Sequence, residues 1–228
     1  MPKYWDLFKS LIIFINFLSE LIRKFGIIRN NYYDISQARV LTQIMIKINP
    51  NTHLISNVSY LESRNCDSRP KDMDVDTIII HCISLPDGEY GNDNVIDLFQ
   101  NNLEISKNES FQSLEGAKVS SHIFIRRDGE VIQFVPFNLR AWHAGVSMHL
   151  KKSNCNDFSV GIELEGSVSS RFSENQYKIL IELIATLKSN YPKIRDSNII
   201  GHNEIAPNRK EDPGKFFDWE RIKGLKKQ

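Results

Sequence analysis

Two short runs of branched apolar residues in this chain each end in a histidine. Residues 77–81 read Thr-Ile-Ile-Ile-His, and residues 199–202 read Ile-Ile-Gly-His. Continuous runs of this kind are typical of strands that are buried on both faces of a sheet. An imidazole has no packing reason to end such a strand, and open α/β sheets place their functional sites beyond the carboxyl ends of strands. We therefore expect an α/β domain with His81 and His202 at one edge of its sheet.

The sequence between these two runs alternates between strand and helix patterns. Asp128-Gly129 is a turn signal that closes a hairpin, and Ser173 with Gln176 forms a capping box that opens a helix. That helix should end near Asn190, because Pro192 cannot continue it. The predicted strands are 121–125, 130–135 and 158–165, and the predicted helices are 94–101 and 173–190. Strands that alternate with helices predict a central mixed β-sheet flanked by helices.

The first 44 residues differ in character from the rest of the chain. From Tyr4 to Phe25, apolar residues recur with helical spacing, and the longest uninterrupted apolar run, 11–15, is too short to cross a bilayer. We expect an N-terminal extension at 1–44, which is either an amphipathic helix or an upstream stretch before a true start at Met45, and a catalytic domain at 45–228. Without a secretory signal or lipobox, we expect a cytoplasmic protein. We also expect a monomer that does not associate with membranes.

The charge balance and the cysteines exclude several classes of protein. The chain has 29 basic and 28 acidic residues, so its charge gives no reason to expect a nucleic-acid partner. Its three cysteines, Cys66, Cys82 and Cys155, are scattered and have no C-x-x-C spacing. They predict neither a disulfide framework nor a thiolate zinc knot, and they favour a reducing compartment.

A candidate metal site joins the two strand-end histidines to a carboxylate. The loop that follows His202 contains Asp212, directly before Pro213-Gly214. Two imidazoles and one carboxylate, with a fourth position left to water, form the ligand pattern of a catalytic zinc site. From the spacing alone, two roles are equally open for His81 and His202, namely metal ligation and a structural role.

Two further residues carry potential catalytic groups. Glu163 lies within an apolar strand, between Ile162 and Leu164, where a carboxylate is costly unless it is paired or used. It is either a general base with a pKa raised by burial, or part of an exposed strand face or a buried ion pair. Lys210 is either a solvated surface lysine or a donor to the oxyanion that forms on an attacked carbonyl.

At this point the chain strongly resembles a known family, the cytoplasmic N-acetylmuramoyl-L-alanine amidases that recycle anhydromuropeptides. The segments that carry the resemblance are 81–86, 119–122, 141–147, 156–166 and 202–219, in that order. The resemblance implies a central mixed sheet of the type shared with peptidoglycan recognition proteins. It also implies a zinc ion held by His81, His202 and Asp212, a catalytic Glu163 and a transition-state Lys210.

The resemblance further implies the reaction and its substrate. The family hydrolyses the amide between the lactyl group of anhydro-N-acetylmuramic acid and L-alanine of the stem peptide. We expect this anhydromuropeptide to contact five residues, namely Lys118, His122, Trp142, His143 and Asn154. For His122, a role as a metal ligand is as open as a structural or substrate-pocket role. His143 is expected either to bind substrate or to brace its loop.

The chain departs from the family at three positions. Cys82 follows the first histidine where relatives commonly carry asparagine, and Lys118 and Asn154 stand where relatives carry arginine. Lysine keeps the positive charge but lacks the bidentate fork of arginine. We therefore expect weaker binding of the stem peptide and intact chemistry.

Three other functions compete with this interpretation. A peptidoglycan-binding module without activity would typically lose a metal ligand, whereas this chain keeps all three candidates. An exported wall hydrolase would need an export signal. A phosphodiesterase would need additional grouped carboxylates for a second metal.

Overall fold

Strands β3 (Thr77–Ile83) and β9 (Ser159–Glu165) are neighbouring interior strands of the main sheet in this computed structural model, which describes residues 46–223. They run parallel and pair along their full length, with His81 opposite Glu163. Both strands consist mainly of residues that are buried, as expected for central strands of a covered sheet. The predicted strand at 158–165 is therefore confirmed.

Six strands make up the main sheet, in the order β1-β5-β4-β9-β3-β10. The four shorter strands are β1 (Ser59–Tyr60), β4 (Ile123–Ile125), β5 (Val131–Gln133) and β10 (Ile199–Gly201). Only the β4–β5 pair is antiparallel, and it is the hairpin predicted from Asp128-Gly129. The other pairs are parallel, so the sheet is mixed, as predicted.

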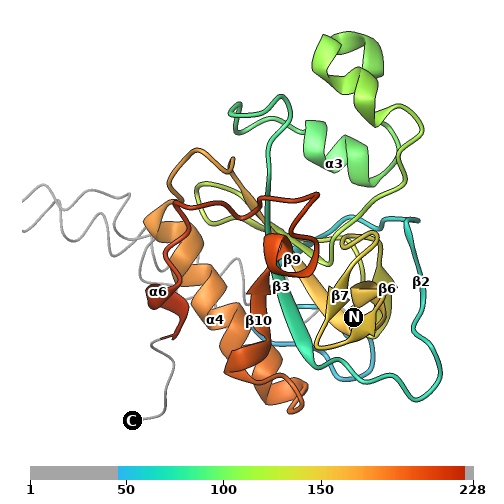
Figure 1. Cartoon of the computed structure of the whole chain (residues 1–228), viewed down its shortest axis with the longest axis vertical. Helices are drawn as coiled ribbons and strands as arrows, with labels where there is room; N and C mark the ends of the chain where they lie inside the picture. The colour runs from blue at the N-terminus through green and yellow to red at the C-terminus, as the bar shows by residue number, and fades with distance from the viewer. Residues whose placement is uncertain (1–45, 224–228) are drawn as a thin grey trace, which may run out of the picture. The chain divides into compact units, whose positions relative to one another are not determined.

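Helix α4 (Glu174–Asn190) covers one face of the sheet (Figure 1). Ser173 and Gln176 form the predicted capping box at its start. Its buried residues pack against the strand residues that point to the same side, including Ile78, Ile80 and Ile162. The shorter helix α3 (Asn94–Phe99) packs in a separate apolar cluster with Phe124 and Ile132, on the other side of the hairpin.

Because side chains alternate along β3 and β9, the two faces of the sheet carry different kinds of side chain. Ile80 and Ile162 point toward α4, so their neighbours His81 and Glu163 point to the opposite face of the sheet. Gly161 lies on that opposite face too, beside Ile79 of β3. The face without α4 therefore carries the side chains of the two candidate site residues, His81 and Glu163.

The remaining elements are short and connect or edge the sheet. The strands are β2 (Cys66–Ser68), β6 (Leu139–Ala141), β7 (Met148–His149) and β8 (Lys152–Ser153), and the last two helices are α5 (His202–Ile205) and α6 (Glu220–Lys223). The 3-10 helices are η1 (Ile105–Lys107), η2 (Glu109–Leu114), η3 (Cys155–Asp157) and η4 (Asp196–Asn198). None of these was predicted, since two to six residues carry too little periodicity to detect.

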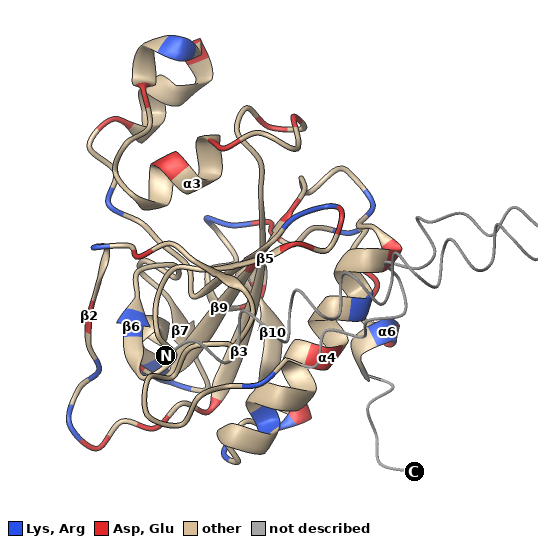
Figure 2. Ribbon diagram, turned by 180° about the vertical axis from the view of Figure 1, so that it is seen from behind, with Lys and Arg blue, Asp and Glu red and all other residues tan. Residues whose placement is uncertain are grey.

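The predicted extension at 1–44 lies outside the described residues, which belong to a unit that begins at Met45. Within residues 46–223, no helix has both the length and the apolar character needed to span a membrane. Basic and acidic residues alternate along the described part of the chain (Figure 2), in line with the nearly neutral composition.

Candidate metal centre and active site

Parallel pairing of β3 with β10 brings His81 and His202 together. Gly201 pairs with Ile80, so the residue that follows each of them lies at the same edge of the sheet. The two Nδ1 atoms are 3.0 Å apart. Oδ2 of Asp212 lies 3.0 Å from Nδ1 of His81 and 3.1 Å from Nδ1 of His202. The three predicted ligands thus converge, although 131 positions separate the first from the last.

These three atoms suit a single divalent cation. His81 is 1% exposed and His202 3% exposed, and the Asp212 side chain is 13% exposed. Zinc accepts imidazole nitrogen and carboxylate oxygen at about 2.0–2.2 Å, and one ion can reach all three atoms at that distance from their present positions. Among the described residues this is the one group of three such side chains found together.

The surroundings leave the histidines in the form that binds metal. Nε2 of His202 lies 3.2 Å from the carbonyl oxygen of Ala144. A carbonyl only accepts hydrogen bonds, so Nε2 of His202 carries a proton, and Nδ1 is the nitrogen that is left to bind a metal. Burial lowers the pKa of His81 to about 4, against the opposing contact with Asp212, so this ring is neutral at physiological pH.

Asp212 keeps its negative charge in this setting. Burial alone would raise the pKa of its carboxyl, but contacts with His202 and His81 outweigh that effect and hold the pKa below its ordinary value. The site therefore offers two imidazole nitrogens and one anionic carboxylate oxygen, the donor types of a zinc ligand set.

Glu163 lies directly beside His81 on the neighbouring strand, and its side chain is 8% exposed. Its Oε2 atom is buried and has no hydrogen-bond partner among residues 46–223. Burial, together with the charge of Asp212, raises the pKa of Glu163 well above its ordinary value. A buried carboxyl group without a partner is costly, and a raised pKa is characteristic of a general base or acid.

Lys210 faces the same site from the loop before Asp212. Its positive charge opposes the rise in the pKa of Glu163 and contributes to lowering the pKa of His81. Within the described residues, no ion pair or hydrogen bond occupies its ammonium group. The ammonium is thus available to donate to a bound ligand.

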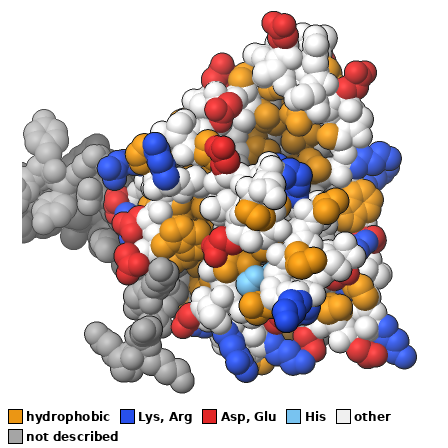
Figure 3. All heavy atoms as spheres, in the orientation of Figure 1, with side chains coloured by type: hydrophobic (Ala, Val, Ile, Leu, Met, Phe, Trp, Pro, Cys, Tyr) orange, Lys and Arg blue, Asp and Glu red, His pale blue; other side chains and the backbone are white. Residues whose placement is uncertain are grey.

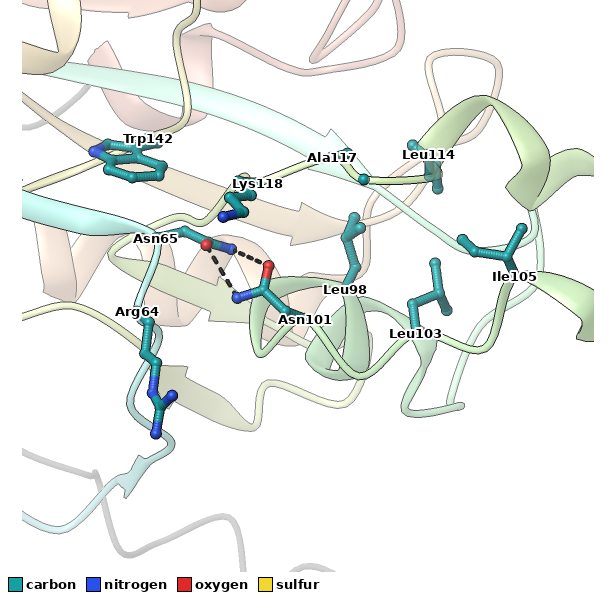
Figure 4. Close-up of a pocket in the computed structure, with 11 residues that line it drawn as sticks. Arg64, Asn65, Leu98, Asn101, Leu103, Ile105, Leu114, Ala117, Lys118 and Trp142 are labelled. Atoms are coloured by element: carbon teal, nitrogen blue, oxygen red, sulfur yellow. Dashed lines mark hydrogen bonds between the residues drawn. The ribbon is translucent and has the colours of Figure 1, made fainter.

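Two of the five predicted substrate-binding residues, Lys118 and Trp142, line a cavity of about 440 Å³. Arg64, Lys118 and Trp142 lie at one end of it, and Leu103, Ile105 and Leu114 at the other (Figure 4). Hydrophobic side chains also gather at the surface of this region, which is at the top of Figure 3. A volume of a few hundred Å³ with apolar walls and few polar groups is typical of ligand pockets.

The other three predicted substrate-binding residues lie elsewhere. His122 is completely buried, where its Nδ1 accepts a hydrogen bond from the N–H of Gly161 and its Nε2 faces the carbonyl of Leu139. His143 is buried beside His81. Asn154 is exposed with a left-handed backbone, φ 58°, a conformation that asparagine tolerates better than most residues. None of the three is among the residues that line the cavity.

Sequence reasoning missed two residues that hold the site together. Arg69 donates hydrogen bonds to the carbonyls of Asn156, Asp157, Phe137 and Ser159, and so ties the segment before β3 to the start of β9. Burial lowers the pKa of Arg69 to about 10, so it stays charged. A lone arginine in an irregular segment gives no signal of this role.

The other missed residue is Asn156. Its Oδ1 accepts hydrogen bonds from the N–H groups of His143, at 3.1 Å, and Ala144, at 2.8 Å. The available signal was an asparagine two residues before the predicted strand at 158–165, in a position where a short polar side chain commonly bonds to the backbone.

Residues 71–215 match the family described as N-acetylmuramoyl-L-alanine amidase. This chain belongs to that family. The amidase is 44% identical to the 1,6-anhydro-N-acetylmuramyl-L-alanine amidase AmpD of Haemophilus influenzae over 168 residues, which cover 74% of this chain and 91% of the relative. It is also 44% identical to AmpD of Escherichia coli over 163 residues, covering 72% of this chain and 88% of the relative.

Solved structures show the same fold. A crystal structure of a selenomethionine derivative of AmpD aligns with a TM-score of 0.74 at 41% identity, and the alignment covers 76% of the amidase and 97% of the AmpD chain. A solution structure of AmpD from Citrobacter freundii aligns with a TM-score of 0.56 at 42% identity, over 75% and 91% of the two chains. The expected fold class is therefore confirmed.

Acid should destabilise the amidase through His122. Burial lowers the pKa of this imidazole to about 3, whereas in the unfolded chain it is about 6.5. Between these values only the unfolded state takes up the proton, so the free energy of unfolding falls by about 1.4 kcal/mol per pH unit as the pH decreases. Urea unfolding of metal-free protein at several pH values measures this slope.

The matched variant is His122→Asn, whose amide oxygen can still accept from the N–H of Gly161 but does not titrate. Over this pH range, the free energy of unfolding of the variant should depend on pH less steeply than that of the wild type. The difference in slope should be about 1.4 kcal/mol per pH unit, which corresponds to one proton. Equal slopes for the two proteins would show that His122 is not the group that titrates.

Proposed function

We propose that this amidase uses zinc to hydrolyse the amide bond between the lactyl group of 1,6-anhydro-N-acetylmuramic acid and L-alanine of the stem peptide, in peptidoglycan recycling. The observation that carries the proposal is the convergence of His81, His202 and Asp212 within 3.1 Å, beside the unpartnered carboxyl of Glu163. The names of the AmpD relatives, which are 44% identical, support this choice of substrate.

Each group at the site has a role that its environment supports. A zinc ion held by the three ligand atoms would supply Lewis-acid activation of the scissile carbonyl and of the attacking water. Glu163 takes the proton of that water and passes it to the departing nitrogen of L-alanine. Lys210 donates a hydrogen bond to the oxyanion that forms on the carbonyl.

The cavity beside Lys118 and Trp142 is the proposed site for the stem peptide. Arg64 and Lys118 are exposed cations without an ion pair in the described part of the chain, so both are available to peptide carboxylates. Trp142 is held in place because its Nε1 donates to Asp67 and its backbone N–H to the carbonyl of Asn65. Its indole offers an aromatic wall for the ligand.

We propose the cytoplasm as the compartment in which the enzyme acts. Cys66, Cys82 and Cys155 are all free thiols, and burial raises the pKa of each one. Free thiols without disulfide partners suit a reducing environment.

The proposed reaction is tested by incubating the purified full chain with anhydromuropeptide and, separately, with intact murein. We expect released stem peptide from the anhydromuropeptide, loss of this activity with a chelator, and its recovery on addition of zinc. Mass spectrometry identifies the products. Full activity after removal of all divalent metal would contradict the proposed mechanism, and activity on intact murein alone would contradict the proposed substrate.

Glu163→Gln should abolish most activity and yet stabilise the protein. General base catalysis typically contributes about 10²–10⁴-fold to a rate, so turnover should fall by about that factor. Burial raises the pKa of Glu163 above its unfolded value, so ionisation of this group lowers the free energy of unfolding as the pH rises above that unfolded value. At pH 8 the neutral amide should therefore unfold at a higher temperature than the wild type. A variant that is both active and no more stable would remove Glu163 from this role.

Lys210→Ala should lower kcat by about 10²–10³-fold while zinc stays bound, because a donor to the oxyanion is lost but no ligand. Metal analysis and steady-state kinetics of the same preparation separate the two effects. Lys215→Ala, which removes an exposed lysine nearby in the chain, is the control. Near-normal turnover of Lys210→Ala would refute its part in the reaction.

A further inference from the structure

His143 lies between a metal ligand and the backbone, at the centre of a short hydrogen-bonded chain. Its Nδ1 is 2.9 Å from Nε2 of His81, and its Nε2 is 3.3 Å from Oγ of Ser159. Oγ of Ser159 in turn donates to the carbonyl oxygen of Cys155 at 2.6 Å. The chain therefore links His81 to a fixed backbone acceptor through two buried side chains.

The donor and the acceptor of each hydrogen bond in this series follow from its last member, the carbonyl group of Cys155. The carbonyl of Cys155 can only accept, so the hydroxyl proton of Ser159 points to it. Ser159 is then the acceptor for His143, whose Nε2 must carry a proton. A neutral His143 thus has an unprotonated Nδ1, which accepts from Nε2–H of His81. The remaining nitrogen of His81, Nδ1, is the one that faces His202 and Asp212.

Packing holds the ring of His143 in this position independently of the hydrogen bonds. Gly161 on β9 lies under the ring, and a Cβ atom at that position would be 2.5 Å from Cγ of His143. The ring also meets the ring of His81 edge to face, with centroids 5.0 Å apart. Asn156 fixes the backbone at this point, since it accepts from the N–H groups of His143 and Ala144.

We propose that His143 is a positioning residue that sets the tautomer and the ring orientation of His81, so that its Nδ1 is presented to the metal. This inference rests on the proposed function, in which His81 is a zinc ligand. The carbonyl of Ala144, the next residue, does the same for His202. One two-residue segment, held by Asn156, thus orients both histidine ligands, and both ring nitrogens of His143 are used within the protein and not for substrate.

The test compares His143→Asn with His143→Leu. Asparagine and leucine have nearly the same shape, and only the amide oxygen of asparagine can accept the hydrogen bond from His81 in place of Nδ1. Residues that orient a ligand typically contribute 10–100-fold to metal affinity. We expect His143→Leu to bind zinc about 10–100-fold more weakly than the wild type and His143→Asn to regain most of that affinity. Competition with a chromophoric chelator measures the dissociation constants.

Thermal unfolding of the metal-free proteins is the control for a structural effect, because both variants leave a similar space and should melt at similar temperatures. If His143→Leu binds zinc as tightly as the wild type, or if both variants lose affinity equally, the inference is overturned. A wild-type protein that binds no zinc would instead overturn the proposed function, and this inference with it.

A second measurement uses the zinc-loaded wild-type protein and needs no variant to fold. Nitrogen NMR of the imidazoles should show His143 protonated at Nε2 alone, with a coupling through the hydrogen bond between its Nδ1 and Nε2 of His81. A proton on Nδ1 of His143 would contradict the assigned direction and overturn the inference.

Discussion

Parallel pairing of β3 with both β9 and β10 is the constraint on which the site depends. On one side, it places His81 beside Glu163. On the other side, Gly201 pairs with Ile80, so the next residue, His202, lies beside His81. Because side chains alternate along a strand, a shift of one residue in either register would turn these groups toward α4 and into its apolar cluster. The continuous burial of Ile78, Ile80 and Ile162 therefore fixes the chemistry as well as the core.

The protein provides partners for most polar groups of the site, but not for all of them. Asp212 is held ionised by the two histidines, and His202 is held in one tautomer by a backbone carbonyl. Glu163 has no such support, and one of its oxygens is buried without a partner in the described residues. Folding tolerates this cost, which is the usual relation between stability and activity at a catalytic site. This contrast supports the proposed division of roles, in which His81, His202 and Asp212 bind the metal and Glu163 transfers the proton.

Much of the fold, and the convergence of His81, His202 and Asp212, could be predicted from the sequence, because these features have strong local signals. The branched runs ending in His81 and His202 indicated buried strands, and Asp128-Gly129 and the capping box at Ser173 gave the hairpin and the helix. The roles of Arg69, Asn156 and Ser159 could not be predicted, since they depend on which backbone groups the fold brings near. His122 and His143 show the same limit, as only the tertiary structure reveals that both are enclosed beside Gly161.

We propose that the three converging atoms of His81, His202 and Asp212 hold one zinc ion. X-ray absorption at the zinc edge, together with anomalous diffraction from crystals of the zinc-loaded protein, tests it most directly. We predict one zinc per chain, bound by two imidazole nitrogens and one carboxylate oxygen at about 2.0–2.2 Å. A protein that retains no zinc would contradict this account. So would zinc bound at another site, or a ligand shell that contains the sulfur of Cys82, the residue next to His81.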